Sequence, residues 1–269
     1  MGTVFSFDIR DTGGDADPGR RAAVEAALRD AVAWLHRVDA VFSTYRHDSQ
    51  ISRLERGEVT VQECDPEVAE VLARCERAAE ETGGWFTARP GGRLDPSGLV
   101  KGWAVERAAL LLRAAGSTAH SVGGGGDIQT AGDASPGRPW RIGIADPLRP
   151  GGLAAVATGS GIAVATSGNA ERGPHIRHPR TGEPAGALAS LTVVARSLTE
   201  ADVWATAGFA MGPECLRVLE DRPGLEALAV LPDGTVRGTS RFPLLAAAAP
   251  GPAGPGDWRQ ALPSALGQQ

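Results

Sequence analysis

An acid and a hydroxyl stand four residues apart in the segment TEADVWATAGFAMG, residues 199–212. At that spacing Asp202 and Thr206 share one face of a helix, so both oxygens can point the same way. A carboxylate with a hydroxyl suits Mg²⁺, which takes one or two protein carboxylates and leaves its other positions to water and phosphate. The alternative is structural, because Thr199 to Asp202 also resembles a capping box in which Asp202 reaches back to the helix start.

A lysine near a predicted helix start is the second feature with chemical potential. In RLDPSGLVKGWAVERAALLLRAAG, residues 93–116, Asp95 and Ser97 precede an apolar periodic run and predict a helix N-terminus. Lys101 falls in the first turn, where the helix dipole favours anions. A bound phosphate would explain a cation there, because free N–H groups and the ammonium would converge on it. An ordinary surface lysine is the alternative.

Four consecutive glycines, Gly123 to Gly126, precede Asp127. Such a run predicts a loop whose backbone passes close to a ligand or to another part of the chain. No helix follows, so the match to a dinucleotide-binding glycine motif is poor, and no Gly-Lys-Ser/Thr closes a phosphate-binding loop.

Two further side chains invite a functional interpretation. His175 lies in a polar loop, residues 171–186, that also holds His178 and three arginines. Such a histidine can bind phosphate or act as a base, and a solvated polar loop is the alternative. Tyr45, the only tyrosine, is either a platform for a planar ring or a core residue.

Helices and short strands must position these groups. Apolar periodicity predicts helices near 19–41, 66–82 and 97–115 and one from Thr199. Alternation predicts a strand at 3–10 and several short strands between 139 and 168, the run LTVVA predicts a strand at 189–195, and Pro232-Asp233-Gly234 predicts a hairpin. We therefore expect an α+β fold, a two-lobed single unit of mixed or antiparallel sheets flanked by helices.

The length, net charge and cysteine content of the chain limit the functions and compartments that we expect. The 269 residues suffice for one large domain or two modest ones, and a net charge of −5 argues against nucleic-acid binding. Cys64, Cys75 and Cys215 have no metal-ligand spacing and suit a reducing compartment. No signal peptide, lipid anchor or membrane-spanning run is visible, so we expect a cytoplasmic protein without a membrane anchor. Residues 1–244 are expected to form the domain, and the Ala/Pro/Gly-rich residues 245–269 a flexible tail.

Taken together, seven segments resemble one family, the FAD:protein FMN transferases, also called the ApbE family. The matching segments follow the family's order and cover most of residues 1–212. They are MGTVFSF (1–7), VFSTYRHDSQISRLERG (41–57), LDPSGLVKGWAVERAALLLRAAG (94–116), GGGGDI (123–128), PWRIGIADP (139–147), ATSGNAERGPHIRHPRTGEPAG (165–186) and TVVARSLTEADVWATAGFAMG (192–212).

The resemblance implies an enzyme that binds FAD with Mg²⁺ in a cleft between the lobes. It would transfer the FMN half to a serine or threonine hydroxyl of a target protein and release AMP. Asp202, Thr206 and the carbonyl of Gly98 would bind Mg²⁺. Asp95 and Lys101 would contact FAD, with Lys101 near the diphosphate.

The resemblance also implies the flavin contacts and the base. Met1 and Tyr45 would border the isoalloxazine, and the run Phe86, Thr87 and Ala88 falls where the family binds flavin. His175 matches the histidine of the family's His-Ile-x-x-Pro-Arg-Thr-Gly loop. We expect the proton of the target hydroxyl to pass to His175 or Asp202.

Several positions depart from the family pattern. Thr87 and His178 stand where acids are usual, Gly123 stands where Asn or Ser is common, and a lipoprotein signal is missing. Only ARPGGR, residues 88–93, replaces a long helical insertion. These departures concern the target and the turnover more than flavin binding. Hydrolysis of FAD to FMN and AMP and non-catalytic FAD binding are the alternative functions.

Overall fold

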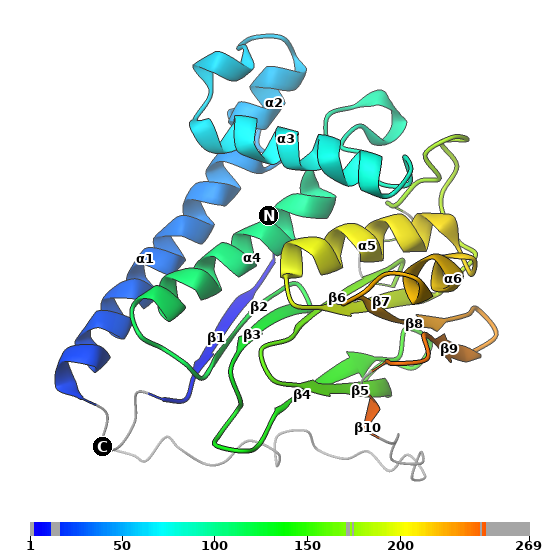
Figure 1. Cartoon of the computed structure of the whole chain (residues 1–269). Helices are drawn as coiled ribbons and strands as arrows, with labels where there is room; N and C mark the ends of the chain where they lie inside the picture. Colours follow the sequence, from blue (N-terminus) through cyan, green and yellow to red (C-terminus); the bar gives the residue numbers. More distant parts are fainter. Residues whose placement is uncertain (1–2, 12–16, 171–172, 174, 243, 246–269) are drawn as a thin grey trace.

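Two antiparallel sheets and a group of helices make up the chain in a computed structural model, which describes residues 3–11, 17–170, 173, 175–242 and 244–245 (Figure 1). The strands are β1 (Phe5–Ile9), β2 (His120–Gly124), β3 (Asp127–Ala131), β4 (Trp140–Ala145), β5 (Leu153–Gly159), β6 (Ala163–Gly168), β7 (Ser190–Ala195), β8 (Glu226–Val230), β9 (Val236–Gly238) and β10 (Leu244–Leu245). The larger sheet has the order β1-β2-β3-β6-β7-β8-β9, and the smaller one has the order β10-β5-β4.

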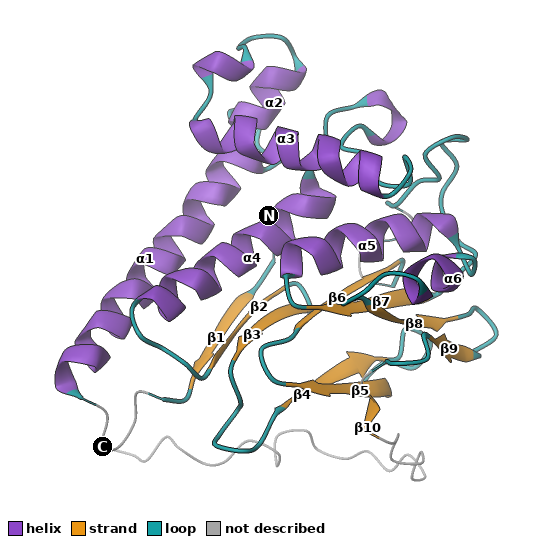
Figure 2. Cartoon of the chain, in the orientation of Figure 1, coloured by secondary structure: helices purple, strands orange, loops and turns teal. Residues whose placement is uncertain are grey.

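Helices cover one face of the larger sheet, and the smaller sheet lies beneath its other face (Figure 2). The helices are α1 (Pro18–Phe42), α2 (Gln50–Glu55), α3 (Pro66–Glu81), α4 (Ser97–Ala114), α5 (Leu198–Met211) and α6 (Cys215–Glu220), with the 3₁₀ turns η1 (Val61–Glu63) and η2 (Pro90–Gly92). The expected α+β class is confirmed. None of the described helices combines the length and the apolar character that crossing a bilayer requires.

Strand β7 shows how the layers are joined. All six of its residues are buried, because both faces of the strand are covered. Leu191 and Val193 belong to the core under the helices, whereas Val194 belongs to the core shared with the smaller sheet. The period-2 alternation of a strand thus feeds two separate cores.

Helix α4 is more deeply buried than a single apolar face would allow. It packs against α1, α5 and strand β2, and half of its 18 residues are buried. On the α1 side, the ring of Trp103 meets Trp34 and Phe42 edge-on at centroid distances of 5.0 and 5.7 Å. Such edge-on pairs contribute roughly 0.5–1.5 kcal/mol each beyond their buried area. The helix that carries Lys101 is therefore held rigidly.

The glycine run differs from the loop expected from the sequence. Gly123 and Gly124 are the last residues of β2, and only Gly125 and Gly126, at φ +57° and +85°, form the hairpin turn to β3. A Cβ at Gly124 would lie 2.7 Å from the Phe5 ring and 2.9 Å from Val105, so packing on another part of the chain explains the missing side chain. The turn glycines supply the positive φ that other residues rarely adopt.

Local predictions at the helix ends are confirmed. Helix α4 begins at Ser97, whose N–H donates to Oδ1 of Asp95 at 3.0 Å, and Gly116 follows the helix with φ +99°. Helix α3 begins at Pro66 after Asp65. The predicted hairpin joins β8 to β9. Met1 and the tail residues 246–269 lie outside the described residues.

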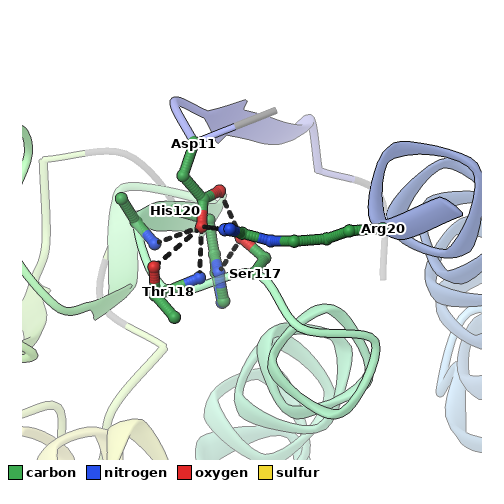
Figure 3. A network of polar contacts seen from close by, with 6 residues as sticks. Asp11, Arg20, Ser117, Thr118 and His120 are labelled. Carbon is green, nitrogen blue, oxygen red and sulfur yellow. Dashed lines mark hydrogen bonds and ion pairs between the residues drawn. The ribbon is translucent and has the colours of Figure 1, made fainter. Parts of the chain in front are cut away.

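A polar network joins the end of β1 to the turn between α4 and β2 (Figure 3). The carboxylate of Asp11 accepts hydrogen bonds from the hydroxyls of Ser117 and Thr118, each at 2.9 Å, and pairs with Arg20 of α1. Burial alone would raise the pKa of Asp11, but the backbone N–H of Thr118, the two hydroxyls and the Arg20 charge outweigh it and lower the pKa to about 2. The network therefore fixes the first strand against two helices.

Candidate active site

One cavity of about 290 Å³ gathers most of the residues that the sequence singled out. It lies where the N-terminal part of α4, helix α5, the end of β6 and the loops after α1 and α3 meet. The predicted residues that line it are Tyr45, Phe86, Thr87, Asp95, Gly98, Lys101, His175, Asp202 and Thr206. Residues as far apart in the sequence as Tyr45 and Thr206 thus contribute to one site.

Asp202 and Thr206 project from α5 into this cavity, as their spacing predicted. The capping alternative for Asp202 is wrong. The N-cap of α5 is Ser197, whose hydroxyl accepts from the N–H of Glu200, and Glu106 of α4 accepts from the N–H of Thr199 at 2.9 Å. Since neighbouring residues satisfy the first amides of α5, the Asp202 carboxylate can face the cavity instead.

Two glycines of α4 let that helix approach the acid. The N–H of Gly102 donates to Oδ2 of Asp202 at 2.9 Å, and a Cβ on Gly102 would lie only 2.6 Å from the carbonyl oxygen of Leu198. In a regular helix this N–H donates to the carbonyl of residue 98, so Asp202 competes with Gly98 for it. A Cβ on Gly98 would lie 3.3 Å from both Phe86 and Thr206, so the backbone there runs close to the hydroxyl.

Lys101 lies between two buried carboxylates. Its Nζ is 2.7 Å from Oδ2 of Asp127 and 3.6 Å from Oδ1 of Asp202. Burial raises the pKa of Asp202 well above its usual range, and the Asp127 charge acts in the same direction, whereas the Lys101 ammonium and the Gly102 amide lower it. The carboxylate has lost most of its water, so a nearby cation stabilises its charged form.

Aromatic side chains border the same cavity. Tyr45 is 86% exposed, so the core interpretation of this residue is wrong, and its ring is accessible to a planar ligand. Phe86 is buried and forms part of the cavity wall. Ala88 does not line the cavity. Its carbonyl accepts from the N–H of Asp95 at 2.7 Å, so it holds Asp95 in place.

A known protein family matches the segments that build this site. The model of the ApbE family matches residues 1–89 and 87–229. The chain belongs to the ApbE family. This membership confirms the resemblance expected from the sequence.

Named relatives and solved structures agree with the family. The chain is 33% identical over 187 residues to the FAD:protein FMN transferase of Rhodobacter capsulatus, covering 65% of this chain and 36% of that protein. It is 30% identical over 151 residues to that of Escherichia coli strain K12, covering 52% and 43%. The chain therefore spans less than half the length of these curated relatives.

The matches to solved structures cover a larger share of each matched chain than the matches to the curated relatives do. The flavin transferase ApbE of Vibrio cholerae superposes with a TM-score of 0.73 at 25% identity, over 91% of this chain and 96% of that one. The ApbE protein of Thermotoga maritima has a TM-score of 0.72 at 23% identity, over 88% and 97%. The ApbE fold is thus present almost in full.

His175 also borders the cavity of this ApbE-family chain, at its accessible side. Its Nδ1 lies 3.0 Å from the carbonyl oxygen of Gly173. When Nδ1 carries the proton and donates it to that oxygen, Nε2 is left as an acceptor. His178, which stands where the family usually has an acid, packs its ring edge-on against Trp85 at 5.0 Å instead.

Sequence reasoning missed Asp127, Thr166 and Ser167. Asp127 opens β3 directly after the glycine turn, and its Oδ1 accepts from the N–H of Thr166 at 2.9 Å. The hydroxyl of Ser167 lies 3.5 Å from that of Thr206. The position of Asp127 immediately after a run of glycines is the signal that the sequence offers for it.

The donor set at α5 suits a hard cation. No cluster of three or more His, Cys, Asp and Glu side chains that could hold a metal occurs in the described part of the chain. The oxygens of Asp202 and Thr206, with the carbonyl of Gly98 that the resemblance implies, would make a mixed set with a single carboxylate, and Mg²⁺ completes such partial sites with water and phosphate. The buried carboxylate of Asp202, in the same cavity wall as Thr206, fits such an ion.

Proposed function

We propose that this chain transfers the FMN half of FAD to a serine or threonine hydroxyl of a target protein, in a reaction that requires Mg²⁺ and releases AMP. The observation that carries the proposal is that the Asp202–Thr206 pair, Lys101 and the exposed Tyr45 line the same cavity. The relatives that bear the name FAD:protein FMN transferase support the same reaction.

In this proposal Asp202, Thr206 and the Gly98 carbonyl hold the metal. When bound, Mg²⁺ would neutralise charge on the phosphoryl oxygens. Lys101 adds a second positive charge from the first turns of α4, toward the diphosphate. Tyr45 offers its ring to the isoalloxazine, and Phe86, Thr87 and Asp95 border the bound FAD, with Met1 as a further expected flavin contact.

The transfer step is a displacement at phosphorus. The hydroxyl oxygen of the target bonds to the FMN phosphorus, the bond from that phosphorus to the bridging oxygen breaks, and AMP leaves with the bridging oxygen. The hydroxyl proton must pass to a base. His175 is accessible to an approaching protein, whereas Asp202 is buried, so His175 is better placed to take the proton and Asp202 to hold the metal.

The test is to incubate the full chain with FAD, with and without Mg²⁺, and with a peptide that carries a serine or threonine acceptor. We expect AMP together with an FMN-sized mass gain on the peptide, only when Mg²⁺ is present. Asp202→Ala should abolish this Mg²⁺-dependent turnover, and undiminished activity would remove Asp202 from the site. AMP with free FMN and no modified peptide would indicate hydrolysis, and FAD binding without AMP would indicate a binding protein.

The cellular setting belongs to the same proposal. We infer a cytoplasmic protein that acts on protein rather than nucleic-acid partners, with residues 1–244 as its domain. The net charge of −5 supports the choice of partner. Cys64, Cys75 and Cys215 are free thiols, and the last two are buried, which suits a reducing compartment.

A further inference from the structure

Asp127 is fully buried beside the cavity and contacts the lysine of α4. Its Oδ2 lies 2.7 Å from Nζ of Lys101, whereas the nearer oxygen of Asp202 lies 3.6 Å from the same nitrogen. The ammonium is thus shared unequally between two carboxylates, and it lies closer to the one that the proposed reaction does not use.

The backbone around Asp127 fixes its carboxylate. The residue follows the tight glycine turn of the β2–β3 hairpin and pairs with Gly124 across it. Its second oxygen, Oδ1, accepts from the N–H of Thr166 on β6 at 2.9 Å. A backbone donor on a neighbouring strand therefore sets the direction in which Oδ2 faces Lys101.

We propose that Asp127 is a positioning residue that retains the Lys101 ammonium on the β3 side of the cavity and so keeps Asp202 available to the divalent cation. The inference rests on the proposed function, because it takes Asp202 as the metal ligand. A lysine ammonium and a divalent cation both seek the buried Asp202 carboxylate, and each weakens the binding of the other by charge repulsion. Asp127 offers the lysine a second, closer partner.

The test uses Asp127→Asn in the full chain, because the amide keeps the shape and can still accept from Thr166. The probe is Mn²⁺ alone, with the unbound ion measured by electron paramagnetic resonance. We expect the Mn²⁺ dissociation constant to rise roughly tenfold or more, because Lys101 then moves onto Asp202. The Mg²⁺ concentration for half-maximal AMP release should rise in parallel, and excess Mg²⁺ should restore turnover, which a structural lesion would not allow.

A second variant, Lys101→Met, tests whether Asp127 affects metal binding through the lysine. With the ammonium removed, Asp127→Asn should change the Mn²⁺ affinity by less than about twofold, because residues that act through one another are not additive. Lys101→Met alone should leave Mn²⁺ binding equal or tighter, a result that can be read even if Asp127→Asn fails to fold. Weaker binding by Lys101→Met, or an equal loss from Asp127→Asn with and without the lysine, would overturn the proposal.

Asp11→Asn is the matched control, because Asp11 is also an acid that accepts several hydrogen bonds (Figure 3). Asp11 is not among the residues that line the cavity. The control variant should lower the unfolding temperature and leave Mn²⁺ binding unchanged. Unaltered Mn²⁺ binding by Asp127→Asn, with normal binding by the unmodified chain, would overturn this inference alone. Failure of the unmodified chain to bind Mn²⁺ would overturn the proposed function and this inference with it.

Discussion

The backbone N–H of Gly102 donates a hydrogen bond of 2.9 Å to Oδ2 of Asp202, so helix α4 orients the acid of helix α5. The contact is possible because Gly102 has no side chain, and a Cβ there would lie 2.8 Å from the Cβ of Asp202. The geometry of the candidate metal site thus depends on the close approach of two helices.

The first prediction concerns this approach. Gly102→Ala should push α4 and α5 apart, because the new methyl group would meet the Leu198 carbonyl at 2.6 Å. We expect a loss of roughly 1–3 kcal/mol in the free energy of unfolding, as for other overpacked cores. Urea unfolding measures this loss, and Mn²⁺ binding should weaken as well. Gly186→Ala is the control, because a Cβ at Gly186 meets nothing within 4 Å. Equal stability of the two variants would contradict the prediction.

The second prediction concerns the charge of Lys101. Lys101→Ala should weaken FAD binding by roughly 10- to 100-fold, as expected for a hydrogen bond to a charged group. Riboflavin has no phosphate, so its affinity should change little. Isothermal titration with both ligands makes the comparison, and equal losses would remove Lys101 from the diphosphate.

The third prediction separates flavin binding from stability at Tyr45. Because this ring is 86% exposed, Tyr45→Ala should change the free energy of unfolding by less than about 0.5 kcal/mol. The same variant should weaken riboflavin binding, since an aromatic pair contributes roughly 0.5–1.5 kcal/mol beyond its buried area. Tyr45→Phe should retain the affinity. Quenching of flavin fluorescence measures both variants, and normal binding by Tyr45→Ala would exclude stacking.

The fourth prediction concerns pH and the buried His120 of the network in Figure 3. Burial lowers the pKa of His120, assisted by the charge of Arg113 and opposed by the Ala109 carbonyl and by Asp11. The unfolded chain therefore binds a proton at higher pH than the folded chain does, so stability is full above about pH 6.5 and falls as the pH drops below it.

Urea unfolding between pH 8 and pH 5 tests this dependence. His120→Gln cannot take up the proton, so its unfolding midpoint should fall less over that interval than the midpoint of the unmodified chain. Thr166→Ala, a change outside the network, should keep the original slope. Identical slopes for the unmodified chain and His120→Gln would show that His120 contributes nothing to the pH dependence.

The sequence by itself determined the features that depend on near neighbours in the chain. Helix α4 begins beside Asp95 and ends before Gly116, because an acceptor side chain and a residue able to adopt positive φ act within a few positions. The shared face of Asp202 and Thr206 likewise follows from helical spacing, and the alternation of buried and exposed residues along strand β4 is read from adjacent residues.

Only the tertiary structure decided which of these features meet. Asp127 contacts Lys101 because β3 lies beside α4, a relation that no spacing in the sequence encodes. Asp202 can face the cavity because Glu106 of α4 accepts a hydrogen bond from a backbone N–H at the start of α5. Half of the glycine run belongs to a strand, since Phe5 and Val105 pack against it. Packing between distant segments selects among alternatives that local propensity leaves equal, so the site emerged only when the helices were placed on the sheet.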